Sequence, residues 1–98
     1  YRMPFILDGL ISLTAAAIGV SIDPMLKYYM IASNVPLEPG AHYALKFLDV
    51  QGMFSLGLAN GEGTAALLAL PTLRMGLNAY NEVATFNAGG VEAYIPLN

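Results

Sequence analysis

Residues 4–22 read PFILDGLISLTAAAIGVSI, and this stretch decides the fold class. Residues 4–7 form a short apolar run that ends at Asp8-Gly9, which is typical of a buried parallel strand that stops where a helix begins. The alanine-rich run of residues 10–20 has little polar face and predicts a helix buried on most sides. Asp23-Pro24 ends that helix.

The same order of strand and helix recurs twice along the chain. Residues 28–32 predict a second strand, and Glu38-Pro39-Gly40 opens a helix that runs to about Val50. Residues 53–58 predict a third strand, followed by a glycine-rich turn. Strands that alternate with helices predict an α/β fold, here part of a doubly wound parallel sheet with flanking helices.

Three helical segments complete the expected elements. A short helical turn over residues 24–27 precedes the second strand. A long apolar helix starts at Ala65, and Pro71 should kink or split it. Residues 82–86 predict a further short helix, which the glycines that follow should stop.

The composition indicates that this chain does not stand alone. It has 98 residues, of which 56% are hydrophobic and 11% charged, with a mean hydropathy of +0.56. That excludes disorder and allows one domain at most. A soluble domain carries about 25% charged residues, so this chain has too few charges to coat the surface of an independent domain. We therefore expect residues 1–98 to be a single segment that another segment or chain completes. Tyr1-Arg2 precedes Met3, which favours a piece of a longer protein.

Charge, cysteine content and hydropathy exclude several classes of function. The net charge is -3, and the four basic residues are scattered, so no nucleic-acid surface is expected. The chain has no cysteine and a single histidine, so we expect no metal site and no cofactor; the lack of cysteine also fits the reducing cytoplasm. The longest apolar run, residues 9–22, is shorter than the roughly 20 residues that span a bilayer, so no membrane partner is expected.

Ligands of parallel α/β sheets bind in the loops beyond the carboxyl ends of the strands. Here these three loops are Asp8-Gly9, residues 33–38 and residues 60–64. Glu62, in the third of these loops, stands between Gly61 and Gly63, where the backbone can approach a ligand closely. Three roles are open for this turn. Glu62 could complement the dipole of the following helix, it could act as a general base, or the backbone amides of the turn could cradle a phosphate.

Five motifs, in this order and at these distances, carry a resemblance to a known family. They are Leu7-Asp8-Gly9, Glu38-Pro39-Gly40, Gly61-Glu62-Gly63-Thr64, Leu68-Ala69-Leu70-Pro71 and Ala84-Thr85-Phe86. The chain resembles the carboxyl-terminal part of the nicotinate-nucleotide:dimethylbenzimidazole phosphoribosyltransferases. The resemblance implies that an azole nitrogen attacks the anomeric carbon of nicotinate mononucleotide, that nicotinate leaves, and that a carboxylate removes the azole proton. It also implies a homodimer.

The resemblance also implies roles for single residues. Glu62 is then the general base, and the backbone at Gly9 lies against the nucleotide; the glycines beside Glu62 are further candidate contacts, and Asp8 caps the following helix or braces the loop. In the second loop, Ser33, Asn34 and Glu38 contact ribose or phosphate or hold neighbouring loops. The full set of predicted substrate-binding residues is Gly9, Ser33, Asn34, Asn60, Gly61 and Gly63.

The chain departs from the family pattern in two ways that matter for function. Family enzymes are much longer, so the motifs of their amino-terminal part are absent. Ala59-Asn60 stands where the family usually has arginine and then leucine, the latter beside the aromatic base. A polar Asn60 favours an acceptor that forms hydrogen bonds, such as a purine or a phenol. The alternative is a noncatalytic module that keeps the family fold and binds a nucleotide or a partner.

Overall fold

The computed structural model describes residues 2–83, 85–92 and 94–97. Two short strands in these residues form a parallel sheet, in which Phe5 pairs with Met30 and Leu7 with Ala32. The α/β prediction with parallel strands is therefore confirmed. The elements in chain order are β1 (Phe5–Leu7), α1 (Leu10–Ile22), the 3-10 helix η1 (Pro24–Tyr29), β2 (Met30–Ala32), α2 (Pro39–Leu48), α3 (Thr64–Glu82) and α4 (Phe86–Gly89).

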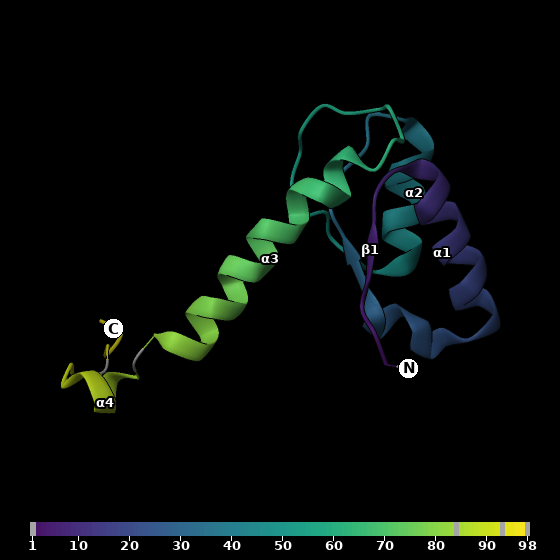
Figure 1. The fold of residues 1–98 in the computed structure, drawn as a ribbon. Coiled ribbons are helices and arrows are strands. Elements are labelled where there is room, and N and C mark those ends of the chain that lie inside the picture. The colour runs from purple at the N-terminus through teal and green to yellow at the C-terminus, as the bar shows by residue number, and fades with distance from the viewer. Residues whose placement is uncertain (1, 84, 93, 98) are drawn as a thin grey trace.

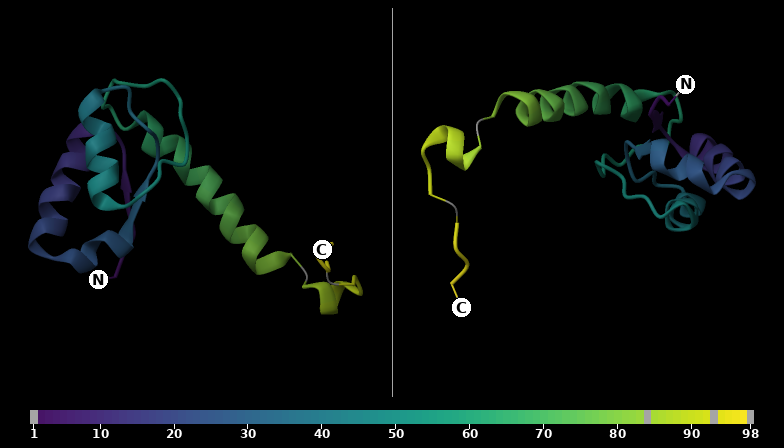
Figure 2. Two further views of the ribbon diagram at one scale, coloured as in Figure 1. Left: turned by 180° about the vertical axis from the view of Figure 1, so that it is seen from behind. Right: turned by 90° about the horizontal axis from the view of Figure 1, so that it is seen from below.

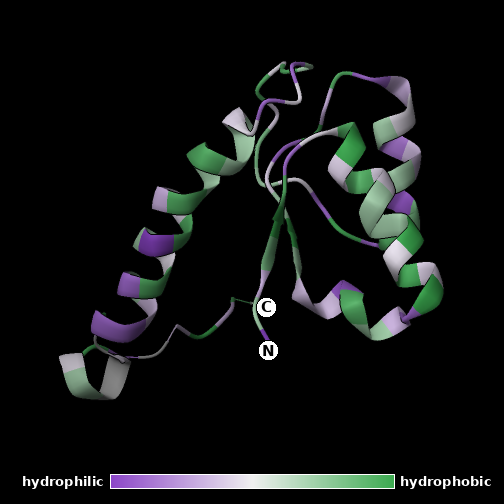
Figure 3. Ribbon diagram, turned by 45° about the vertical axis from the view of Figure 1, so that its right-hand side comes forward, coloured by the Kyte–Doolittle hydropathy of each residue, from purple (hydrophilic) through white to green (hydrophobic). Residues whose placement is uncertain are grey.

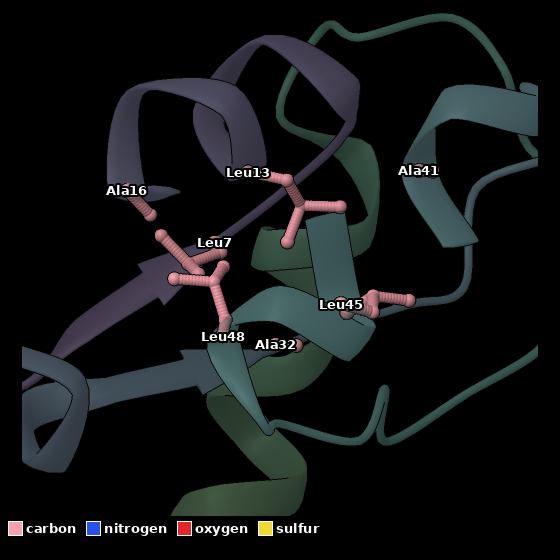
Figure 4. Packing of buried hydrophobic residues seen from close by; sticks show 7 residues of the cluster. All are labelled: Leu7, Leu13, Ala16, Ala32, Ala41, Leu45 and Leu48. Atoms are coloured by element: carbon pink, nitrogen blue, oxygen red, sulfur yellow. The ribbon is translucent and has the colours of Figure 1, made fainter. Parts of the chain in front are cut away.

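The core lies where α1 and α2 pack against the two strands (Figure 4). On α2, the buried residues Ala41, Leu45 and Leu48 recur at helical spacing, so that one face of the helix is apolar. They meet Leu13 of α1, which has no exposed surface. The complete buried cluster is Leu7, Leu13, Ala16, Ala32, Ala41, Leu45 and Leu48.

The third strand predicted over residues 53–58 is wrong as a regular element. Within the described residues, this segment forms one isolated parallel bridge, between Asn34 and Phe54. The segment pairs with the chain just beyond β2, where the Asn34 side chain replaces a main-chain acceptor by binding the Leu56 amide. Gly57 then changes the direction of the backbone with a φ of 66°, and one further main-chain bond to the second loop follows it, from the Leu37 amide to the Leu58 carbonyl. Side-chain pairing and an early turn thus interrupt the ladder.

Helix α1 begins as predicted, but the expectation that it is buried on most sides is wrong. Its buried residues are Leu13 and Ala16. Ile11 and Ile22 are each 82% exposed, although both are large and apolar. The elements described here cover one face of α1 and leave the other uncovered.

Helix α3 leaves the rest of the chain and extends outward (Figures 1 and 2). Its buried residues are Ala65 and Ala69, near its beginning. Pro71 does not split the helix, which continues to Glu82. The radius of gyration is 16.9 Å, whereas a compact domain of this length has one of about 13 Å.

The last predicted helix, over residues 82–86, is displaced in the structure. Helix α3 takes in Glu82, and α4 begins at Phe86. Ala84, which also belongs to the Ala84-Thr85-Phe86 motif, lies outside the described residues.

Candidate functional site

The three predicted loops gather at one end of the sheet, beyond the carboxyl ends of β1 and β2 (Figure 1). A small cavity of about 10 Å³ lies between them. Its wall includes Gly9 from the first loop, Asn34 and Glu38 from the second, and Asn60 and Gly61 from the third. We call it the Glu38 cavity.

Asp8 ties the first loop to the third. Its Oδ2 accepts a hydrogen bond from the Gly63 amide at 2.9 Å, and its Oδ1 accepts one from the Ala66 amide at 3.2 Å. Free amides at a helix N-terminus favour a carboxylate, since they carry partial positive charge. Asp8 therefore caps α3 and not α1, which corrects the prediction that it caps the helix that directly follows it. At α1, Gly9 is the N-cap residue and makes no side-chain cap.

Ser33 and Asn34 are almost fully buried, at 0% and 2% exposed. The Ser33 hydroxyl donates to the Leu7 carbonyl at 2.6 Å, and Asn34 Oδ1 accepts from the Leu56 amide at 2.9 Å. These bonds join the second loop to β1 and to the segment before α3. Both side chains hold neighbouring loops, one of the two roles expected of them, while a contact to substrate stays a prediction.

The turn from Gly61 to Gly63 presents Glu62 at the surface. Gly61 and Gly63 have φ angles of 60° and 79°, a region that side-chain-bearing residues avoid. Glu62 is exposed, and within the described residues its carboxylate makes no hydrogen bond. Because Asp8 holds the Gly63 amide, the turn is fixed directly after Glu62. The carboxylate is free to meet a ligand from a turn that is itself anchored.

An open cavity of about 320 Å³ lies on the other side of this turn. We call it the Gly9 cavity, since Gly9, Gly61 and Gly63 contribute backbone to its wall. A Cβ atom at Gly9 would approach the Gly61 Cα to 3.6 Å, so a side chain at this position would come into van der Waals contact with the turn. Ile11 and Ala15 of α1 form an apolar part of the wall. Small-molecule sites typically have volumes of about 300–1,000 Å³ with mostly apolar walls.

Asn60 lies at the start of the same turn and is exposed. Its amide nitrogen donates to the Thr64 hydroxyl at 3.2 Å. Asn60 and Ala59 line the Glu38 cavity. The Gly9 cavity is lined by Gly61 and Gly63 of this turn, and Asn60 is not part of its wall. A contact between Asn60 and an aromatic base stays a prediction.

Neither a metal-binding group of side chains nor a membrane-spanning helix is found among the described residues. No group of three or more histidine, aspartate and glutamate side chains there could hold a metal ion. Among the helices that the structure describes, none is long and apolar enough to cross a bilayer.

Sequence reasoning did not foresee that Asp8 caps α3. The carboxylate and the amides that it binds are 55 and 58 residues apart in the chain, so no local pattern reveals the pairing. The sequence does indicate that the two segments lie close together, because Asp8 and the Gly61–Gly63 turn both follow predicted strands of one parallel sheet. That placement predicts proximity but no particular bond.

Comparison with known proteins now decides the family. Residues 1–91 match the family model described as Phosphoribosyltransferase. The nicotinate-nucleotide–dimethylbenzimidazole phosphoribosyltransferase of Clostridium acetobutylicum is 40% identical over 97 residues, which are 99% of this chain and 28% of that protein. The chain belongs to this phosphoribosyltransferase family. The expectation drawn from its motifs is confirmed.

Other members of the phosphoribosyltransferase family agree. The Shewanella baltica protein of the same name is 39% identical over 94 residues, which are 96% of this chain and 26% of that protein. The crystal structure of the Thermus thermophilus protein superposes with a TM-score of 0.86 at 34% identity, covering 93% of this chain and 27% of that one. The chain therefore spans about a quarter of the length of these relatives.

Proposed function

We propose that this chain, completed by the rest of the phosphoribosyltransferase fold, transfers phosphoribosyl from nicotinate mononucleotide to an aromatic base. The product is the lower-ligand nucleotide of a cobamide, and Glu62 is the general base. One observation carries the proposal: Glu62 is exposed on a turn that Asp8 anchors through the Gly63 amide, beside a cavity of about 320 Å³. We call this chain together with the rest of its fold the complete assembly.

The proposed reaction needs one carboxylate placed beside the acceptor. The acceptor atom, a ring nitrogen of an azole or purine or the hydroxyl oxygen of a phenol, forms a bond to the anomeric carbon of the ribose, while the bond from that carbon to the nicotinate nitrogen breaks. The bonding electrons go to the nicotinate ring, which loses its positive charge and leaves. The Glu62 carboxylate takes the proton from that acceptor nitrogen or oxygen. The proton, the electron pair and the leaving group are then all accounted for without a metal or cofactor.

The cavities supply candidate contacts for the nucleotide. Gly9, Gly61 and Gly63 expose backbone where a side chain would block approach, and the amides of the turn favour a negatively charged group. Ser33 and Asn34 support these loops from behind, in keeping with their bonds to Leu7 and Leu56. We propose Gly9, Gly61 and Gly63 as nucleotide contacts, with Ser33, Asn34 and Asn60 as further candidates.

This chain supplies only part of the family fold. The chain spans about 27% of the Thermus thermophilus protein. A groove of about 360 Å³ beside β1 and α1, lined by Phe5 and Met30 among others, offers apolar surface to another strand or helix. We propose that the rest of the same polypeptide, or a second chain, covers this groove. We further propose that two copies of the complete assembly form a homodimer, and that it works in the cytoplasm.

The acceptor base is open among azoles, purines and phenols. Asn60 presents an amide group where the family usually has leucine, which favours a purine or a phenol over dimethylbenzimidazole. The specificity constants of the complete assembly for adenine, a phenol and dimethylbenzimidazole measure this directly. A far higher value for dimethylbenzimidazole would reject the role of Asn60 in acceptor choice.

The test of the base is Glu62→Gln in the complete assembly. We expect kcat for nicotinate release to fall by about 10²–10⁴-fold, the usual contribution of a general base. The unfolding midpoint should stay unchanged, because Glu62 is exposed. Glu82→Gln, at the exposed end of α3, is the matched control and should keep full activity. Near-normal turnover in Glu62→Gln would remove Glu62 from the base role.

A noncatalytic binding module is the second candidate, because Ala59-Asn60 departs from the family pattern beside the proposed base. Such a module would bind nicotinate mononucleotide or a partner protein without cleaving the glycosidic bond. Binding by the complete assembly, without nicotinate release for any acceptor offered, would establish this reading over the catalytic one.

A further inference from the structure

Glu38 carries a polar atom that the fold buries without a partner. Its Oε2 has essentially no exposed surface, and within the described residues no donor lies within hydrogen-bond distance. Glu38 is the N-cap residue of α2, yet its side chain does not cap the helix. The local helix therefore does not explain where this carboxylate points.

The Glu38 cavity gives that oxygen a specific surrounding. Its volume is about 10 Å³, and a cavity needs about 10–15 Å³ to hold one water molecule. The wall is polar in several places, since Asp8, Asn34 and Asn60 contribute carboxylate and amide groups. The remainder comes from residues 58–61, the segment that directly precedes Glu62, together with Gly9, Pro36 and Ala65.

The side-chain oxygens of Asp8 and Asn34 are acceptors that already bind other amides, so they cannot serve Glu38 Oε2. Asp8 accepts from the Gly63 and Ala66 amides, and Asn34 Oδ1 accepts from the Leu56 amide. None of these bonds satisfies Glu38. A buried acceptor without a donor is destabilising, and more so when it is charged. One water molecule, which donates two hydrogen bonds, meets the requirement in a cavity of this size and polarity.

We propose that Glu38 is a positioning residue whose Oε2, through one water held in this cavity, fixes residues 58–61 and hence the turn that carries Glu62. This inference rests on the proposed function for its effect on catalysis. The water links the start of α2 to the wall of the third loop, parallel to the main-chain bond from the Leu37 amide to the Leu58 carbonyl at 3.2 Å. The turn is thereby held on both sides: Asp8 holds Gly63 after Glu62, and Glu38 holds the segment before it.

The experiment compares Glu38→Ala with Glu38→Gln in the complete assembly. Alanine removes the acceptor, whereas glutamine keeps a carbonyl oxygen in the same place and loses only the charge. We expect Glu38→Ala to lower kcat for nicotinate release by about tenfold, because small displacements of a catalytic group are costly. KM for nicotinate mononucleotide should stay within about twofold, since Glu62 acts on the acceptor proton. Glutamine should restore kcat.

Hydrogen exchange gives a readout that does not depend on activity. The amides of Leu37 and Gly63, bonded to Leu58 and Asp8, report on the two anchors of the loop. In Glu38→Ala the protection of Leu37 should fall by about tenfold, as local opening becomes easier, while that of Gly63 changes less. Glu82→Ala, at the exposed end of α3, is the matched control for loss of a glutamate.

The outcomes separate the two proposals. If the wild type releases nicotinate and Glu38→Ala leaves both kcat and Leu37 protection unchanged, the positioning role is wrong. Equal losses in Glu38→Ala and Glu38→Gln would also overturn it, because the charge and not the acceptor would then matter. If the wild type releases no nicotinate, the proposed function fails, and the exchange data alone decide whether Glu38 holds the loop.

Discussion

At the scale of single residues, the site depends on polar side chains that bind backbone. Asp8 binds two amides of α3, Ser33 binds the Leu7 carbonyl, and Asn34 binds the Leu56 amide. Asp8 and Asn34 bind amides that lie outside the two strands, whereas the Leu7 carbonyl that the Ser33 hydroxyl binds also accepts from the Ser33 amide. The loops are thus held by side chains where the sheet itself ends, and this leaves Glu62 as the exposed acid of the turn.

Asp8→Ala should be destabilising because it leaves two amides of α3 without their acceptor. We expect the free energy of unfolding of the complete assembly to fall by about 2 kcal/mol, as for the loss of a charged helix cap. Urea denaturation measures the change. Asp23→Ala is the comparison, since the exposed Asp23 carboxylate accepts one local bond from the Met25 amide; its loss should be smaller. Equal losses would show that Asp8 contributes no more than an ordinary surface cap.

At the scale of elements, the chain after α2 crosses the end of β2 at very close range. A Cβ atom at Gly52 would lie 2.7 Å from the Asn34 carbonyl carbon and 2.8 Å from the Val35 nitrogen. Both are backbone atoms, so no side chain can move aside. The crossing brings residues 53–56 beside the second loop, where Phe54 and Asn34 form their bridge. Gly52 therefore permits the pairing that positions the segment leading to Glu62.

Gly52→Ala should force the two segments apart. We expect a loss of about 1–3 kcal/mol in the free energy of unfolding, the usual cost of overpacking, together with reduced nicotinate release, because Asn34 moves. Gly76→Ala is the control. Gly76 lies within α3 with nothing within 4 Å of its Cβ position, so alanine there should be neutral or stabilising. An unchanged unfolding midpoint in Gly52→Ala would mean that the crossing relaxes freely.

At the scale of the whole molecule, apolar surface is left uncovered on α1 and α3. Figure 3 shows hydrophobic residues on α3, which stands apart from the strands. Leu67 is 67% exposed and Leu70 51% exposed, although large leucine side chains are normally buried. Contiguous exposed apolar surface of this kind marks a contact with another part of a protein. The relatives are about three and a half times as long as this chain, which agrees with a missing cover.

The purified chain should therefore not remain a monomer of 10.4 kDa. We expect native mass spectrometry to show self-association, or a complex with a longer polypeptide, because burial of apolar surface is favourable by about 25 cal/mol per Å². Leu67→Lys combined with Leu70→Lys should shift the population toward monomer. Lysines at Gln51 and Ser55, exposed polar positions outside α1 and α3, form the control pair and should leave association unchanged. A wild-type chain that stays monomeric would contradict the missing cover.

The sequence by itself determined the order of elements, the parallel α/β class, the position of Glu62 on a turn between two glycines, and the family. These depend on local patterns: apolar runs of strand length, proline and glycine at helix ends, and motifs at set distances. Its errors were the third strand, the burial of α1, the position of the last short helix and the helix that Asp8 caps; of the kink or split predicted at Pro71, the split did not occur. Each depends on what packs against a segment, and a local pattern does not record that.

Only the tertiary structure decided which groups meet. Asp8 binds amides 55 and 58 residues away, and Asn34 binds one 22 residues away. The burial of Glu38 Oε2 likewise depends on residues 58–61 closing over it. A carboxylate can accept from any unpaired amide that the fold brings within about 3 Å, so its partner follows from the path of the chain and not from its neighbours in sequence.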